Sequence, residues 1–272
     1  MSGSPTTSSD GRLGQRWAAL RAAGRAALIP YVTAGYPDAG ATAAFLRGAE
    51  RAGADVVELG IPWSDPVADG PVIQASTHAA LEGGMTLSRA LALLAEARTG
   101  LPVVVFSYLN PILADGPARF ARAARAAGAA GVLAVDLPVD SDPAVEGALR
   151  SSGLPLVRLA APTTTPQRLR RIAAVSEGFL YLLARVGVTG ASATVPGELA
   201  ARVAAARACT NLPIAVGFGI SSAAQAADVA RLADGVVVGS AVVERLGQGG
   251  AEPALRWLAE LRTAMDAPRS AA

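Results

Sequence analysis

The chain has 272 residues, of which 51% are hydrophobic and 17% charged, with a formal net charge of +2. This suits one large domain or two small ones with a sizeable core, and the scattered arginines form no dense basic stripe of the kind that nucleic acid requires. All 24 basic residues are arginine, and His78 and Cys209 are the single histidine and cysteine, which excludes lysine Schiff bases, a pyridoxal-phosphate aldimine, a Walker-type phosphate loop, zinc sites with several Cys or His ligands and disulfides within the chain.

Residues 1–11 are polar and carry no apolar segment of the kind found in a secretory signal. The longest apolar runs, such as 101–106, are far too short to cross a bilayer. We therefore predict a cytoplasmic protein with a polar, disordered N-terminal tail over 1–11 and a single domain over 12–272.

Eight short apolar runs, rich in β-branched residues, recur along the chain and indicate β-strands. They cover 26–33, 55–59, 102–106, 131–136, 154–160, 178–184, 212–218 and 234–240. The stretches between them are rich in Ala, Leu and Arg at helical spacing, so the alternation predicts a single (β/α)8 TIM barrel. A doubly wound open sheet is the competing fold. It is disfavoured because no G-x-G-x-x-G follows the first strand and the period continues through eight units.

The connections after the second and sixth predicted strands are longer than the others. Barrel enzymes place their chemistry in loops at the C-terminal ends of the strands, so extra length there indicates function. The first connection begins within "VVELGIPWSDPVADGP" (56–71), where acidic residues are concentrated among prolines and glycines. The second contains "RVGVTGASATVPG" (185–197), whose glycines and small polar residues suit a mobile lid.

Glu58 lies at the C-terminal end of the second predicted strand. Strand alternation places it on the same face as Val56, whereas Val57 and Leu59 face the other way. If Val56 points into the barrel, Glu58 lies at the barrel mouth, where partial desolvation raises its pKa and suits it to give and take a proton. The alternative is a structural glutamate that pairs with an arginine or caps the following turn.

Asp65 and Asp69 lie in the same connection as Glu58, in the turn-forming sequences "SDP" and "DGP". Taken singly, each is more typical of a turn residue than of a catalyst. The surrounding prolines stiffen this loop, and a stiff loop holds a reacting group in place. Both aspartates therefore remain candidates for the site.

Glycine-containing segments follow the last three predicted strands, at 187–190, 217–222 and 239–243. Loops after the seventh and eighth strands of such barrels often bind phosphate through backbone N–H groups at a helix N-terminus. Ser240 could add a hydroxyl donor. Together these segments predict a phosphorylated substrate, although tight strand-to-helix turns also need glycine.

Three further residues have weaker signals. His78 falls in a helical stretch and is more typical of a capping or packing residue than of a catalyst, and Cys209 ends a helical stretch and is interpreted as structural. Tyr181 alternates to the same face as Phe179 and Leu183, so it lines the barrel mouth or fills the core.

Over about residues 12–265 the chain resembles the tryptophan synthase alpha chain family. Four segments are similar to the signature regions of that family, in the same order and spacing: "VELGIPWSDPVADGP", "YLLARVGVTGA", "VGFGISS" and "GVVVGSAVV". The segments "LIPYVTAGYPD", "FSYLNPIL" and "VDLP" also look like parts of it.

The resemblance implies a lyase that splits indole-3-glycerol phosphate into indole and glyceraldehyde 3-phosphate without a cofactor in this chain. Glu58 matches the general acid/base that protonates indole C3 and handles the proton of the side-chain hydroxyl. Asp69 matches the carboxylate that receives the indole N–H and stabilises the positive charge on the ring.

Further roles are implied by the same match. Tyr181, Thr189 and Phe218 match substrate-binding residues, and the phosphate donors match Gly190, Gly219, Gly239 and Ser240. The loop that contains Asp65 matches an element that communicates with a beta chain. That partner carries pyridoxal phosphate, forms an alpha2-beta2 heterotetramer with this chain and receives the indole for tryptophan biosynthesis.

Three alternatives stay open at this level. The chain could be a stand-alone lyase that releases free indole, or a non-catalytic docking subunit that activates its partner, although keeping both Glu58 and Asp69 argues against the second. It could also be another phosphosugar barrel enzyme, such as an isomerase or epimerase, which would need different acid/base groups.

Overall fold

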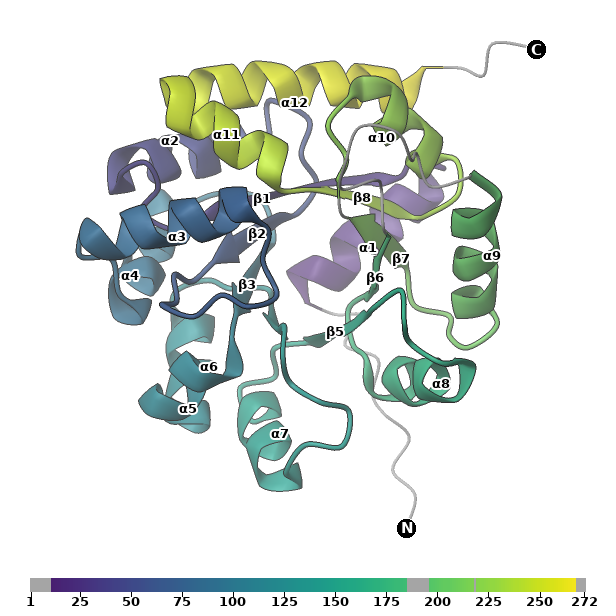
Figure 1. Cartoon of the computed structure of the whole chain (residues 1–272), viewed down its shortest axis with the longest axis horizontal. Helices are drawn as coiled ribbons and strands as arrows, with labels where there is room; N and C mark the ends of the chain where they lie inside the picture. The colour runs from purple at the N-terminus through teal and green to yellow at the C-terminus, as the bar shows by residue number, and fades with distance from the viewer. Residues whose placement is uncertain (1–10, 185–195, 218, 268–272) are drawn as a thin grey trace.

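A computed structural model describes residues 11–184, 196–217 and 219–267. Its eight strands form one closed barrel in the order β1 to β8, and every neighbouring pair is parallel (Figure 1). The strands are β1 (Ala27–Thr33), β2 (Val57–Gly60), β3 (Val103–Ser107), β4 (Gly131–Ala134), β5 (Leu156–Ala160), β6 (Leu180–Leu183), β7 (Ile214–Gly217) and β8 (Gly235–Val238). The predicted barrel is confirmed, and the alternative of an open sheet is wrong.

Twelve helices lie in the described part of the chain, more than one for each strand. They are α1 (Arg12–Ala22), α2 (Ala39–Gly48), α3 (Pro71–Glu82), α4 (Leu87–Ala97), α5 (Leu109–Asp115), α6 (Pro117–Ala126), α7 (Pro143–Arg150), α8 (Pro166–Val175), α9 (Pro196–Arg207), α10 (Ala223–Ala230), α11 (Ser240–Gly249) and α12 (Ala251–Asp266). The extra length after β2 is a ten-residue loop followed by α3 and α4, and α5 and α6 follow each other after β3. Residues 1–10 lie outside the described range, so the polar tail stays a prediction.

Two hydrophobic cores follow from strand alternation. Val57 and Leu59 of β2 point outward into the layer between strands and helices. Val56 instead belongs to a second core inside the barrel, with large side chains such as Phe179, just before β6. The face predicted for Glu58 is therefore confirmed, because it shares the inward face with Val56.

Helix α1 closes the N-terminal end of the barrel. Trp17 of this helix is 6% exposed, and its ring centroid lies 5.6 Å from that of Phe179. The ring also reaches Gly235 at the start of β8, where an added Cβ would lie 2.9 Å from the indole. The inner core is thus sealed at this end, and the other end is left for chemistry.

None of the helices in the described part of the chain is both long enough and apolar enough to span a bilayer.

Candidate active site

A cavity of about 240 Å³ lies at the C-terminal ends of the strands, between the inner barrel core and the loops. Six residues predicted from the sequence line it: Glu58, Asp69, Tyr181, Gly219, Gly239 and Ser240. They come from β2, the loop before α3, β6, the loop after β7 and the start of α11. Residues that are far apart in the sequence therefore meet at the functional end of the barrel.

Glu58 is almost fully enclosed, with 1% of its surface exposed. Burial raises the pKa of its carboxyl group to about 8. Among the described residues, no hydrogen-bond donor reaches its buried Oε1 atom. A carboxyl group in these surroundings carries its proton at neutral pH and has an oxygen available for a substrate. Within the described residues no arginine pairs with Glu58, and burial alone accounts for its raised pKa, which disfavours the alternative of an ion-paired structural glutamate.

Asp69 is held by two side chains that clamp its loop. The hydroxyl of Tyr108 donates to Asp69 Oδ2 at 3.0 Å and accepts from the backbone N–H of Ala68 at 2.9 Å. From α3, Gln74 Nε2 donates to the backbone carbonyl of Asp69 at 2.8 Å. Burial raises the pKa of the Asp69 carboxyl, and the hydrogen bond from Tyr108 opposes part of that rise.

Tyr108 and Gln74 were not predicted from the sequence. Tyr108 directly follows β3, so its place at the C-terminal end of a strand was a usable signal. Gln74 gave no comparable signal: it lies only five residues after Asp69, but it belongs to α3 and not to the end of a strand.

Two tyrosines flank Glu58. Tyr31 of β1 is its register partner across the β1–β2 pair, and Tyr181 lines the cavity from β6. Each phenol has a raised pKa, first because of burial and then because of the negative charges of Glu58 and Asp69. Tyr31 was missed in the sequence, although it alternates with Ile29 on the inward face.

Glycines in two strands make room for these rings. A Cβ at Gly60 would lie 2.0 Å from the Tyr31 hydroxyl oxygen, and one at Gly217 would lie 2.4 Å from that of Tyr181. No side chain fits at such distances, which explains why β2 and β7 each end in glycine. The wall of the cavity thus depends on the pairing of each tyrosine with a glycine.

The N-terminus of α11 faces the cavity through Gly239 and Ser240. Within the described residues no side chain caps this helix, so its first N–H groups are open to an anion. The N-terminus of α10 differs, because Ser222 and Gln225 form a capping box there. Gly219, with φ at +76°, brings the loop between β7 and α10 to the cavity wall.

Several predicted residues lie elsewhere. Asp65 is exposed and accepts a hydrogen bond from Ser64 at 2.6 Å, so it does not line the cavity. His78 is exposed on α3, and Cys209, just after α9, donates through Sγ to the carbonyl of Ala205 at 3.2 Å. The remaining predicted site residues, Thr189, Gly190 and Phe218, fall outside the described part of the chain.

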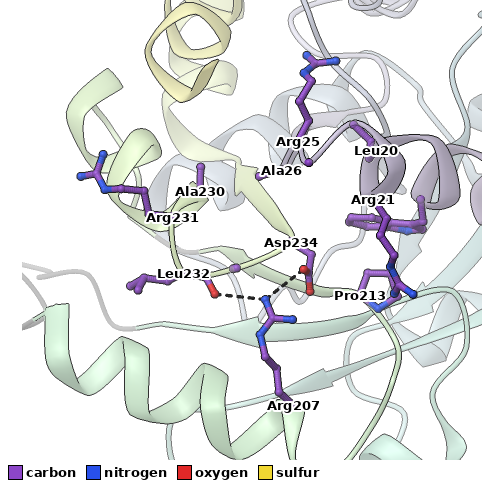
Figure 2. A pocket seen from close by; sticks show the side chains of 13 residues that line it. Leu20, Arg21, Arg25, Ala26, Arg207, Pro213, Ala230, Arg231, Leu232 and Asp234 are labelled. Atoms are coloured by element: carbon purple, nitrogen blue, oxygen red, sulfur yellow. Dashed lines mark hydrogen bonds and ion pairs between the residues drawn. The ribbon is translucent and has the colours of Figure 1, made fainter. Parts of the chain in front are cut away.

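A second cavity, of about 300 Å³, lies at the opposite end of the barrel. The arginines that line it are Arg21, Arg25, Arg207 and Arg231. Arg207 donates to the carbonyl of Leu232 at 3.4 Å and pairs with Asp234 at 3.1 Å, as Figure 2 shows. Arg25 pairs with Asp266 at 3.2 Å. Arg231 pairs with Asp228, so three of these four arginines are in ion pairs. The cavity also lies at the end of the barrel where the strands begin, so we assign the chemistry to the first cavity.

The fold and the first cavity define a class: a (β/α)8 barrel whose cavity at the C-terminal ends of the strands holds two carboxyl groups suited to acid–base chemistry and a helix N-terminus without a side-chain cap. Residues 17–267 match the model of one family, described as tryptophan synthase alpha chain. The chain belongs to this family, as its sequence motifs predicted.

Individual relatives agree with the family match. The tryptophan synthase alpha chain of Laribacter hongkongensis is 46% identical over 262 residues, which cover 94% of this chain and 99% of that protein. Subunit alpha of tryptophan synthase from Legionella pneumophila has a TM-score of 0.86 at 35% identity, covering 94% of this chain and 98% of that one. An aminoacrylate-bound tryptophan synthase from M. tuberculosis contains a chain with a TM-score of 0.84 at 36% identity, again covering 94% of this chain and 99% of that one.

Proposed function

We propose that this chain is the alpha subunit of a tryptophan synthase and that Glu58 and Asp69 cleave indole-3-glycerol phosphate in the first cavity. Membership of the family makes the chain a lyase of tryptophan biosynthesis. The observation that carries the assignment of residues is Glu58, a carboxyl group with a pKa of about 8 that shares one cavity with a second carboxylate.

The reaction breaks the bond between indole C3 and the glycerol side chain, and protons balance through Glu58. Protonated Glu58 gives its proton to C3, which makes the ring an electron-poor indolenine. The resulting carboxylate takes the proton of the adjacent side-chain hydroxyl. The C–C bond then breaks, its electrons restore the indole, and the aldehyde of glyceraldehyde 3-phosphate forms.

Asp69 stabilises the cation that this route requires. Its carboxylate receives the indole N–H while positive charge develops on the ring, and Tyr108 holds one of its oxygens in place. The phosphate lies at the opposite wall, against the N-terminus of α11 at Gly239 and Ser240. Gly190, Thr189 and Phe218 are proposed to complete the substrate site.

The expected partner is a pyridoxal-phosphate-containing beta chain in an alpha2-beta2 complex in the cytoplasm, to which indole passes directly. Two large exposed apolar side chains, in segments that follow the C-terminal ends of β2 and β3, support a partner on this face. Val67, in the loop of Asp65, is 85% exposed, and Leu113 of α5 is 45% exposed. Burial of such side chains against another protein is favourable.

The test is cleavage of indole-3-glycerol phosphate by the purified chain, alone and with the beta chain of the same organism. We expect cleavage that increases strongly with the beta chain. Glu58→Gln and Asp69→Asn should each lower kcat by about 100-fold or more with the fold intact, because each removes a charge or proton that the transition state needs. The exposed carboxylate of α3, Glu82, provides the control Glu82→Gln, which should stay active.

Other outcomes separate the alternatives. Full activity in either active-site variant would contradict its assigned role. Cleavage that the beta chain does not change would favour a stand-alone lyase, and a complex without any cleavage would favour a docking subunit.

A further inference from the structure

Buried hydroxyl groups connect strand β1 to helix α3. Thr33 Oγ1 and Ser76 Oγ are 2.7 Å apart, and Ser76 Oγ donates to the carbonyl of Ile73 at 2.8 Å. Because the single hydroxyl proton of Ser76 goes to Ile73, Thr33 must donate to Ser76.

This connection is fully enclosed. Thr33 is 0% exposed and Ser76 is 1% exposed. An apolar pair of the same shape would fill this space without needing hydrogen bonds, and a satisfied buried pair adds little net stability. A hydrogen bond is directional, whereas an apolar contact is not. The pair therefore fixes one residue of α3 at a set distance and angle from β1.

Both elements carry parts of the active site. Asp69 lies two residues before Pro71, the first residue of α3, and Gln74 of α3 donates to its backbone carbonyl. Strand β1 presents Tyr31, which is the register partner of Glu58. The hydrogen bond between Thr33 and Ser76 therefore joins the half of the site that holds Asp69 to the half that holds Glu58.

We propose that Thr33 and Ser76 are positioning residues for the cleavage reaction. Their hydrogen bond sets the placement of α3, and through it the distance of Asp69 from the indole that Glu58 protonates. Neither residue lines the cavity, so both act through Asp69. The inference rests on the proposed roles of Glu58 and Asp69.

The experiment compares Thr33→Val and Ser76→Ala with the wild-type chain in the complex with the beta chain. We expect each variant to lower kcat about tenfold or more, because displacement of a catalytic group by about 1 Å can cost 100-fold. KM should change little, since phosphate binding at the start of α11 is untouched. The double variant should be no slower than the worse single variant, because both changes break one bond.

Two further variants separate positioning from packing. Thr33→Ser keeps the hydroxyl and should restore kcat to within about threefold of wild type, although it loses a buried methyl group. Thr77→Val is the matched control on the same helix. Thr77 is 3% exposed and makes no hydrogen bond to β1 within the described residues, so its change should leave kcat near wild type.

Circular dichroism and thermal unfolding verify that each variant is folded, and if Thr33→Val is not, the comparison of Ser76→Ala with Thr77→Val decides. A wild-type kcat in folded Thr33→Val or Ser76→Ala would overturn the positioning role alone. An equal loss in Thr33→Ser or in Thr77→Val would do the same. Absence of cleavage by the wild-type complex would instead overturn the proposed function.

Discussion

At the scale of single residues, Glu58 combines two features that do not favour stability. It is buried, and one of its oxygens has no hydrogen-bond partner within the described residues. Buried polar atoms are normally satisfied, and exceptions need an explanation. A substrate that completes the missing hydrogen bonds provides one, and the folded protein then loses some stability in exchange for a proton donor.

The burial of Glu58 should make the free energy of unfolding depend on pH. Glu58 has a pKa of about 8 in the folded chain against a usual value of 4.5. Between these values the folded protein keeps a proton that the unfolded chain has released, so rising pH progressively lowers the free energy of unfolding. Glu58→Gln removes this effect. Its stability relative to wild type should rise by the order of a few kcal/mol from pH 4.5 to 8 and then level off.

Urea unfolding of both proteins at several pH values between 4.5 and 9 measures this difference. Glu82→Gln, which removes an exposed carboxylate, should show no comparable trend. A stability difference between Glu58→Gln and wild type that is constant across this range would contradict the raised pKa.

Tyr108 supports the second carboxylate, and Tyr108→Phe removes only its hydroxyl. Asp69 then loses a donor and Ala68 N–H loses an acceptor, so kcat/KM should fall about tenfold. The hydrogen bond from Tyr108 lowers the pKa of Asp69, so its loss should move the acidic limb of the pH–rate profile to higher pH. An acidic limb that stays in place would show that Tyr108 does not act on Asp69.

At the scale of elements, α10 and α11 show why one helix start is open to an anion and its neighbour is closed. The four-residue sequence from Ser222 to Gln225 caps α10 with its own side chains. The start of α11 has glycine in the N-cap position and no such partner within the described residues. The glycines of both loops were visible in the sequence, but only the packing of the two helices shows that α11 points at the cavity.

Ser240→Ala tests whether the N-terminus of α11 binds the phosphate. The backbone N–H groups of α11 persist in the variant, so KM for indole-3-glycerol phosphate should rise severalfold while kcat at saturating substrate stays near wild type. Ser222→Ala is the comparison at the neighbouring helix. It should lower stability by about 1 kcal/mol through loss of a cap without raising KM. A collapse of kcat in Ser240→Ala would mean that its hydroxyl acts in the chemistry.

At the scale of the whole molecule, the two ends of the barrel differ: one carries the candidate active site and the other is closed by core packing. The C-terminal end holds the carboxyl groups, and α1 fills the N-terminal end with Trp17 packed on Phe179. A helix that precedes the first strand is therefore part of the inner core and not an appendage.

Trp17→Ala should lower the stability of the protein without changing its activity. Removing the buried ring leaves a void in the inner core and should lower the free energy of unfolding by about 3–5 kcal/mol. The active site lies at the other end, so kcat at 25 °C should remain near wild type for the folded fraction. Trp17→Phe should lose less stability. Unchanged stability in Trp17→Ala would mean that α1 unfolds independently of the barrel.

The sequence by itself determined the barrel, the inward face of Glu58 and the family. These are local or periodic properties: strand alternation sets which way a side chain points, and a repeated strand–helix unit closes in few ways. Only the tertiary structure decided that Glu58 has an oxygen without a partner, that Tyr108 and Gln74 hold Asp69, and that Thr33 meets Ser76. The contacts of Tyr108 with Asp69 and of Thr33 with Ser76 join segments about 40 residues apart, and the desolvation of Glu58 arises only when the barrel is packed. The contact of Gln74 with Asp69 spans only five residues, but it depends on how the loop folds back onto the start of α3.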